Sequence, residues 1–177
     1  LSLFATLVER LGDTQGEAWL KGVVANMARD PKGGDTDQVK AVASGECGVA
    51  LSNSYYVARL LKSDKPEDRA TMEKVRVVFP NQGTSGAHVN IAGAAVAKHA
   101  KNRDNAVAFM EFLASPYAQD YFANGNNEFP AVKGLKVDNP AIKAMGGDNF
   151  KAEQIPLGVV AKNMTKVQQM LDRVGYK

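Results

Sequence analysis

Residues 45–61 read GECGVALSNSYYVARLL, and the interpretation of the whole chain starts from them. The apolar run over 47–51 predicts a short β-strand, and the polar residues 52–54 predict a turn. A helix is predicted from the tyrosines onward, with Ser54 as its N-cap, because a serine hydroxyl can accept an amide hydrogen of the first turn. Open α/β folds bind ligands at such strand-to-helix turns, at the carboxyl ends of their strands.

Tyr55 and Tyr56 are adjacent at the start of this predicted helix. Neighbouring side chains point to opposite faces of a strand and diverge by roughly 100° around a helix, so both hydroxyls can lean toward one point only at a helix entry. Phenolate is a hard oxygen donor, but tyrosine ordinarily ionises near pH ~10, so a strongly charged cation such as Fe³⁺ is needed to displace the proton. Zn²⁺ would use histidine or thiolate instead. The alternative interpretation is that both rings only pack.

The surrounding sequence carries a family resemblance. DPKGGDTDQVKAVASG leads into GECGVALSNSYYVARLLKSDKPED, and VNIAGAAVAKHAKNRDNAVAFMEFLAS and YFANGNNEFPAV follow. Over essentially all 177 residues this pattern resembles the periplasmic ferric-ion-binding proteins, the substrate-binding components of bacterial iron(III) ABC importers. The resemblance implies that Tyr55 and Tyr56 bind Fe³⁺ from one lobe. It also implies that Asn53 helps to hold a synergistic anion, which would be carbonate, phosphate or citrate.

The fold that the resemblance implies is α/β, a type II periplasmic binding protein of three α/β/α layers, with one lobe and part of a second in this chain. The expected division is 1–86 for the core of the C-terminal lobe, 87–136 for the hinge crossing and the return segment of the N-terminal lobe, and 137–177 for helices that pack back on the C-terminal lobe. The chain resembles the C-terminal half of such a protein. The partners implied are therefore the missing N-terminal half, with the remaining metal ligands, and an ABC permease that takes up iron from the periplasm.

A second anion-binding feature is predicted before the tyrosine pair. A Gly-Gly turn at 33–34 enters a helix and would expose free amide hydrogens, which favour an anion. The resemblance puts Asp35 where some relatives carry an asparagine near the anion, but a carboxylate would repel that anion. The alternative is that Asp35 or Thr36 only caps the helix 37–43. Arg29 either neutralises the anion or is solvated.

Composition excludes several other classes of function. The net charge of +3 is spread along the chain, which argues against a nucleic-acid surface. The sequence contains no run of 18 apolar residues, so no membrane-spanning helix is predicted. Cys47 is the single cysteine, so no intrachain disulfide can form, and it is expected to be a buried thiol. An enzyme built on Cys47, His88 or His99 is not predicted, because no local signature joins a nucleophile to a base.

Two further functions stay open beside iron transport and an enzyme. The same fold carries other small solutes (an oxyanion, a polyamine or thiamine), for which the tyrosines would stack or donate hydrogen bonds. The second open function is a structural or adaptor role, in which the protein does not close on a ligand.

The remaining segments give a coarse map of helices and strands. In the first part of the chain the patterns predict a helix over 1–11 ended by Gly12, a second helix with Trp19 in the core, and strands over 75–80 and 87–96. A helix with a buried face is predicted over 102–114, and Ser115-Pro116 is predicted to begin a helix whose aromatic residues lie in the core. The final helix is predicted to be capped by Asn163 or Thr165. The strand over 87–96 is the expected hinge.

Overall fold

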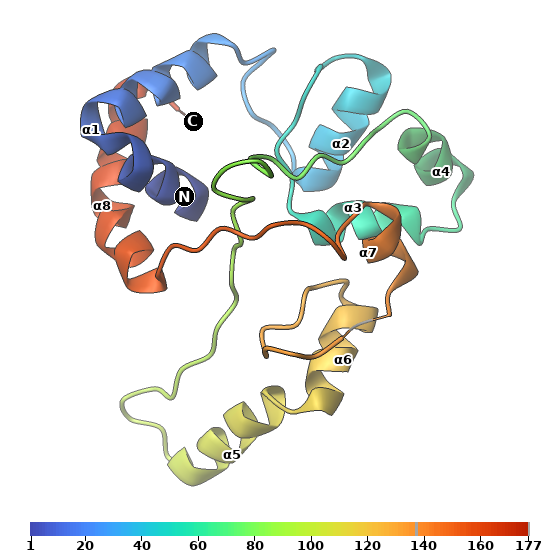
Figure 1. Ribbon diagram of the computed structural model, residues 1–177, viewed down its shortest axis with the longest axis vertical. Helices are drawn as coiled ribbons and strands as arrows, with labels where there is room; N and C mark the ends of the chain where they lie inside the picture. The colour runs from blue at the N-terminus through green and yellow to red at the C-terminus, as the bar shows by residue number, and fades with distance from the viewer. Residues whose placement is uncertain (137, 177) are drawn as a thin grey trace. The chain divides into compact units, whose positions relative to one another are not determined.

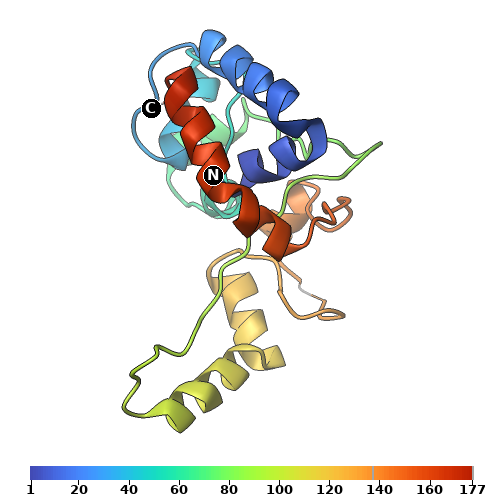
Figure 2. The same ribbon diagram turned by 90° about the vertical axis from the view of Figure 1, so that its left-hand side faces the viewer.

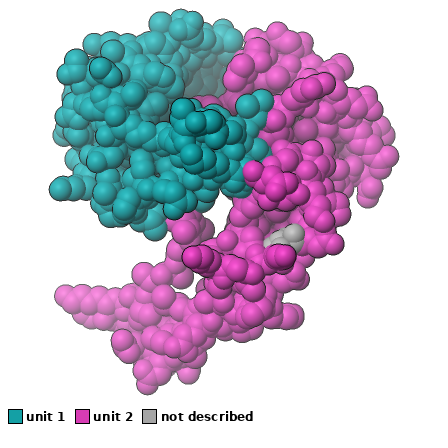
Figure 3. Space-filling view, viewed as in Figure 1, with its two compact units in different colours: residues 1–33, 78–90, 150–177 teal, residues 34–77, 91–149 magenta. Residues whose placement is uncertain are grey.

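The computed structural model describes residues 1–136 and 138–176. This part of the chain forms eight helices in two compact units (Figures 1 and 3). Unit 1 comprises residues 1–33, 78–90 and 150–177, and unit 2 comprises residues 34–77 and 91–149. The lobe boundaries expected from the sequence stay a prediction, and Val137, at one of them, lies outside the described residues.

Unit 1 is held together by α1 (Ser2–Ala25) and α8 (Leu157–Val174), which lie side by side in both ribbon views (Figures 1 and 2). Helix α1 is broken at Gly12, where φ is 74° and ψ is 170°, so the predicted helix end at this glycine is confirmed as a break between two helical stretches. The break lets Gly16 lie against Val8, where a β-carbon would approach the Val8 Cγ2 atom to 2.8 Å. The buried core between the helices is Phe4, Ala5, Val8, Leu20, Val160, Val167, Met170 and Leu171.

Two predictions for unit 1 are wrong. Trp19 is 42% exposed and only one side of it meets Phe4, with ring centroids 6.3 Å apart, because the second stretch of α1 turns this residue outward. Helix α8 begins at Leu157 after an N-cap at Pro156, well before the predicted cap at Asn163 or Thr165. The apolar stripe predicted for this final helix is nevertheless in the core.

A polar cluster lies beside the unit 1 core. An isolated parallel bridge joins Ala87 to Ala152, and it brings His88 next to Glu153. His88 Nδ1 is 2.9 Å from Glu153 Oε2, and Arg10 forms an ion pair with the same carboxylate. His88 Nε2 is 3.0 Å from Ser2 Oγ. Desolvation lowers the pKa of His88, with smaller effects of the N-terminal amine and Arg10 in the same direction.

Unit 2 contains the tyrosine pair. Its core is formed by α2 (Asp35–Ser44), α3 (Ser54–Leu61), α4 (Pro66–Met72) and α7 (Pro140–Ala144), with α3 in contact with each of the other three. The buried residues are Val39, Val57, Ala58, Leu60, Ala141, Ile142 and Met145. Phe129 and Leu61 are half-buried against this cluster. Proline stands at the first turn of α4 and of α7, and Asn139 caps α7 by accepting hydrogen bonds from Ala141 N and Ile142 N.

The aromatic residues of α5 (Arg103–Leu113) and α6 (Pro116–Gly125) are not in a core, contrary to prediction. No residue of α5 is buried, and Tyr117 and Tyr121 on α6 are 74% and 67% exposed. Helical spacing identifies a common face, but only tertiary contacts decide whether that face is covered. Ser115 caps α6 as predicted, accepting a hydrogen bond from Ala118 N.

The predicted strands over 47–51, 75–80 and 87–96 are irregular, extended segments. Within the described residues the Ala87–Ala152 bridge is the only β-pairing. A strand exists only when its backbone is paired with a neighbour, and that pairing depends on residues elsewhere in the chain. Without it the apolar side chains stay uncovered, as Val49 does with 85% exposure. Cys47, predicted to be buried, is half-exposed for the same reason.

The core of unit 1 generates a stability prediction. Leu20→Ala, at a fully buried site, is expected to lower the free energy of unfolding by about 2–5 kcal/mol through lost burial and a residual cavity. Leu11→Ala removes the same atoms from a site that is 39% exposed, and about 0.5 kcal/mol is expected. Urea unfolding of the full-length protein measures both, and equal losses would contradict this assignment of the core.

Candidate metal centre

Tyr55 and Tyr56 lie together at the start of α3. Their ring centroids are 4.3 Å apart, the ring planes are inclined by 34°, and both residues are half-buried. The two rings therefore lie against each other at the helix entry, and convergence of their hydroxyls on one ion stays a prediction.

The buried face of α3 fixes the orientation of the pair. Val57, Ala58 and Leu60 point into the unit 2 core, so the helix cannot rotate without exposing them. The tyrosines occupy the second and third positions of the helix, ahead of this buried stretch. Arg59 lies on the exposed side, with its guanidinium carbon 5.4 Å from the centroid of the Tyr56 ring. A cation over an aromatic face is attracted by the ring and limits its motion.

The turn before α3 is held by Asp35. The Asp35 Oδ2 atom accepts hydrogen bonds from the backbone N of Asn53 at 2.6 Å and from Asn53 Nδ2 at 2.9 Å. Ser52 Oγ is 3.5 Å from the same oxygen. Asp35 is the first residue of α2, and it braces the turn that leads into the tyrosines.

Two capping predictions near the site are wrong. The N-cap of α3 is Asn53, and Ser54 is already helical. The N-cap of α2 is Gly34, whose backbone N donates to Asp37 Oδ2 at 2.8 Å. Asp35 and Thr36 are thus inside α2 and do not cap it. Asp35 does not cap its own helix because its carboxylate instead accepts two hydrogen bonds from Asn53, which is distant in the sequence.

The electrostatics of the pair favour the neutral phenol in the absence of a cation. The hydrogen bond to Tyr56 raises the pKa of Tyr55 to about 12, helped by desolvation and by the nearby charges of Tyr56, Asp35 and Glu128. Two carboxylates therefore make the surroundings of Tyr55 negative. Such surroundings oppose a phenolate alone and favour a phenolate bound to a cation.

Glu128 is a charge that acts on Tyr55 and that the sequence did not indicate. It follows Asn126 and Asn127 in the loop after α6, and Phe129, the residue after it, packs against the core that buries α3. The one signal in the sequence is that Glu128 is the only charged residue between 124 and 130. Nothing in the spacing connects that loop to the tyrosines.

The other residues considered in the sequence lie elsewhere. Arg29 belongs to unit 1 and its Nη1 donates to the carbonyl oxygen of Asp30 at 3.2 Å, so its part in anion binding stays a prediction. His88 is in the polar cluster of unit 1, and His99 is exposed as expected. Within 1–136 and 138–176 there is no group of three or more histidine, cysteine, aspartate or glutamate residues that could hold a metal.

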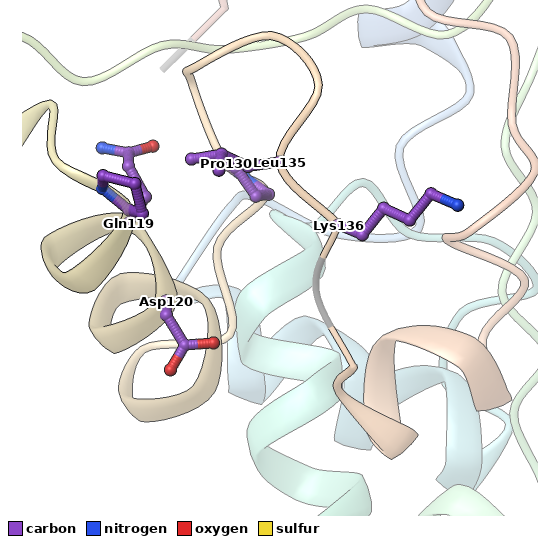
Figure 4. A pocket seen from close by; sticks show the side chains of 6 residues that line it. Gln119, Asp120, Pro130, Leu135 and Lys136 are labelled. Carbon is purple, nitrogen blue, oxygen red and sulfur yellow. The ribbon is translucent and has the colours of Figure 1, made fainter.

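A small cavity in unit 2 does not gather groups for binding. Figure 4 presents its lining, in which the side chains of Asp120 and Lys136 point in different directions. Gln119 is already engaged, since its Nε2 donates to Leu113 O and its Oε1 accepts from Ala131 N. The lining residues are Pro116, Gln119, Asp120, Pro130, Leu135 and Lys136. No polar groups converge there as they do at the tyrosine pair.

Comparison with curated proteins finds relatives in iron uptake. The chain is 42% identical over 179 aligned residues to "Iron uptake protein A2" of Synechocystis sp., an alignment that covers 100% of this chain and 51% of that protein. It is 30% identical over 130 residues to the "Major ferric iron-binding protein" of Neisseria meningitidis, covering 73% of this chain and 38% of the other. The chain thus spans about half the length of the first of these relatives and less of the second. None of the helices in the described residues is long and apolar enough to cross a membrane.

Solved structures give the same result. The ferric binding protein from Campylobacter jejuni superposes with a TM-score of 0.92 at 38% identity, covering 99% of this chain and 55% of that chain. A Trichodesmium protein solved in complex with iron and citrate ligands superposes with a TM-score of 0.91 at 46% identity, again covering 99% of this chain and 55% of that one. These matches confirm the predicted type II periplasmic binding protein fold and the resemblance to ferric-ion-binding proteins. The profile described as "Bacterial extracellular solute-binding protein" matches residues 5–147, and the chain belongs to that family.

Proposed function

We propose that this chain is part of the substrate-binding component of a bacterial iron(III) ABC importer, and that Tyr55 and Tyr56 bind Fe³⁺ as phenolates. The observation that carries the proposal is the pair itself, two phenol rings with centroids 4.3 Å apart at the start of one helix. The relatives named for iron uptake and ferric-iron binding support the same metal.

The chemistry of the pair suits a hard trivalent ion. Two phenolates offset two of the three positive charges of Fe³⁺, and the remaining charge calls for a carboxylate or a bound anion. Citrate is the anion that the Trichodesmium structure supports, and carbonate and phosphate are the alternatives. Asp35 already accepts a hydrogen bond from Asn53, so its proposed role is to brace Asn53 beside such an anion. The proposed role of Arg29 is to neutralise the charge of the anion.

Transport would follow from closure of a two-lobed protein. Iron that binds the closed form better than the open form shifts the population toward closure, with the hinge in the segment 87–96 and lobes divided as 1–86, 87–136 and 137–177. Iron would bind in the periplasm, and the other half of the protein would supply the remaining metal ligands. A permease of the inner membrane would accept the closed, loaded form.

The first test removes one phenol at a time. The iron-loaded, full-length protein should absorb visible light through phenolate-to-iron charge transfer. Tyr55→Phe and Tyr56→Phe should each weaken Fe³⁺ binding by more than about 100-fold, because removing a ligand costs more than removing a residue that only supports one. Absorbance and competition with citrate measure both effects. Tyr117→Phe, on the exposed face of α6, is the matched control and should bind as the wild type does.

Two outcomes would contradict the proposal. A wild-type protein that stays colourless with iron would favour a carrier of another solute, an oxyanion, a polyamine or thiamine, with tyrosines that stack. Unchanged affinity and colour in both phenylalanine variants would mean that the pair only packs.

A second test follows the proton that iron must displace. The pKa of Tyr55 is about 12, so its phenol is protonated near neutral pH, and ligation releases that proton. Raising the pH therefore strengthens binding, by about tenfold per pH unit for each proton released, until the phenol is ionised in the free protein. Potentiometric titration at pH 7 should find one proton fewer released per Fe³⁺ bound in Tyr55→Phe than in the wild type. An equal count in the two proteins would exclude Tyr55 as a phenolate ligand.

A further inference from the structure

Two segments of unit 1 that connect it to unit 2 are bound to each other. Residues 78–90 run directly into unit 2, and residues 150–156 follow directly from it. Ala87 N donates to Lys151 O, and Glu153 N donates to Ala87 O, each at 2.8 Å. These two hydrogen bonds form the parallel bridge of unit 1, so the two connecting segments are joined at one point.

The residues before the bridge bring the two backbones closer still. Gln82 Nε2 donates to Lys151 O at 3.2 Å, and Gln82 Oε1 accepts from Lys151 N at 2.6 Å. Gly86 has a φ of 91°, and a β-carbon there would lie 2.7 Å from Lys151 O. Only glycine combines this conformation with so close an approach.

A largely buried charged cluster lies directly after the bridge. Arg10 of α1 forms an ion pair with Glu153 Oε1, and His88 Nδ1 is 2.9 Å from Glu153 Oε2. The side chains of Arg10, His88 and Glu153 are 30%, 14% and 4% exposed. One carboxylate therefore serves two basic groups, and it ties both connecting segments to α1.

The hydrogen bonds of the cluster fit a neutral His88. The carboxylate of Glu153 has no hydrogen to donate, so His88 Nδ1 carries the hydrogen between them. Nε2 of a neutral imidazole is then an acceptor, and its donor is Ser2 Oγ at 3.0 Å. A second proton on His88 would occupy Nε2, and the Ser2 hydroxyl would have to donate to Asn90 Oδ1, at 3.3 Å, instead.

The charges of the cluster are balanced only while His88 is neutral. Arg10 and Glu153 cancel each other, so a proton on His88 adds a cation with no carboxylate of its own, in a place largely removed from water. The ring also faces the Thr6 hydroxyl, with Oγ1 3.5 Å from Nδ1, and the amine of Leu1, and neither is negative. The pKa of His88 is accordingly lowered, with desolvation as the largest cause.

We propose that Arg10, His88 and Glu153 form a proton-sensitive contact, which holds the segments 78–90 and 150–156 together while His88 is neutral and loosens them when His88 is protonated. A group that takes up a proton more readily after the contact opens makes opening easier as the pH falls. The contact therefore has its full strength above pH 6.5, the ordinary pKa of histidine, and weakens as the pH falls toward the lowered pKa of His88. Residues 87–90 begin the expected hinge, so acid pH would free more of the hinge.

Hydrogen exchange in the full-length protein tests the proposal, because the amides of Ala87 and Glu153 make the bridge. Their protection, taken relative to the intrinsic exchange rate at each pH, should fall by up to about tenfold between about pH 7.5 and pH 5.5, since the lower value is one unit below the ordinary pKa of histidine. His88→Gln should remove this dependence on pH. The matched control is His99→Gln at an exposed site, which should show the wild-type fall.

An NMR titration of the His88 ring in the wild type gives a second measurement that needs no substitution. A pKa below about 6.5, together with the acid-dependent loss of protection, supports the proposal. A pKa at or above that value overturns it, because the folded contact would then favour the proton. Unchanged protection in the wild type also overturns it, and so does an equal loss in His88→Gln, since another group would then be responsible.

This inference does not depend on the proposed function, because the contact contains neither tyrosine and needs no metal. A wild-type protein that stays colourless with iron would overturn the proposed function and leave the proton-sensitive contact standing. Protection that is independent of pH would do the reverse.

Discussion

Burial of one side of α3 is the constraint on which the site depends. An eight-residue helix is too short to be stable alone, so its place is set by tertiary contacts. Val57, Ala58 and Leu60 provide these contacts in the middle of the helix. Asp35 holds the turn at its start, and Lys62, at its end, donates hydrogen bonds to Asn124 O in α6 and to Asn127 Oδ1. Two phenols that would otherwise diverge are thereby kept within reach of one ion.

The same contacts explain the chemical character of the site. Asp35 and Glu128 come from different parts of unit 2, and the charges of both oppose ionisation of the Tyr55 phenol. In the proposed function, the Tyr55 phenol keeps its proton in the free protein and releases it when a cation of high charge binds. The tyrosine pair and the brace at Asp35 are two parts of one arrangement at the start of α3.

Local signals in the sequence were sufficient for the features that depend on local chemistry. Gly12 breaks a helix, Ser115-Pro116 and Asn139-Pro140 begin helices, and the adjacency of Tyr55 and Tyr56 is itself a pattern. Features that depend on distant partners could not be predicted. The apolar run 47–51 has the composition of a strand, but only a paired neighbour makes it one. Tyr117 and Tyr121 have helical spacing, yet spacing does not say whether a face is covered. Glu128 and the Asp35–Asn53 contact join residues far apart in the sequence, so no motif contains them.

A crystal structure of the full-length protein loaded with Fe³⁺ tests the central claim most directly. The account predicts that the phenolic oxygens of Tyr55 and Tyr56 both coordinate the same iron, with α3 and the Asp35–Asn53 contact as they are in the metal-free chain. A structure in which iron is bound while either phenol points away from it would contradict the account.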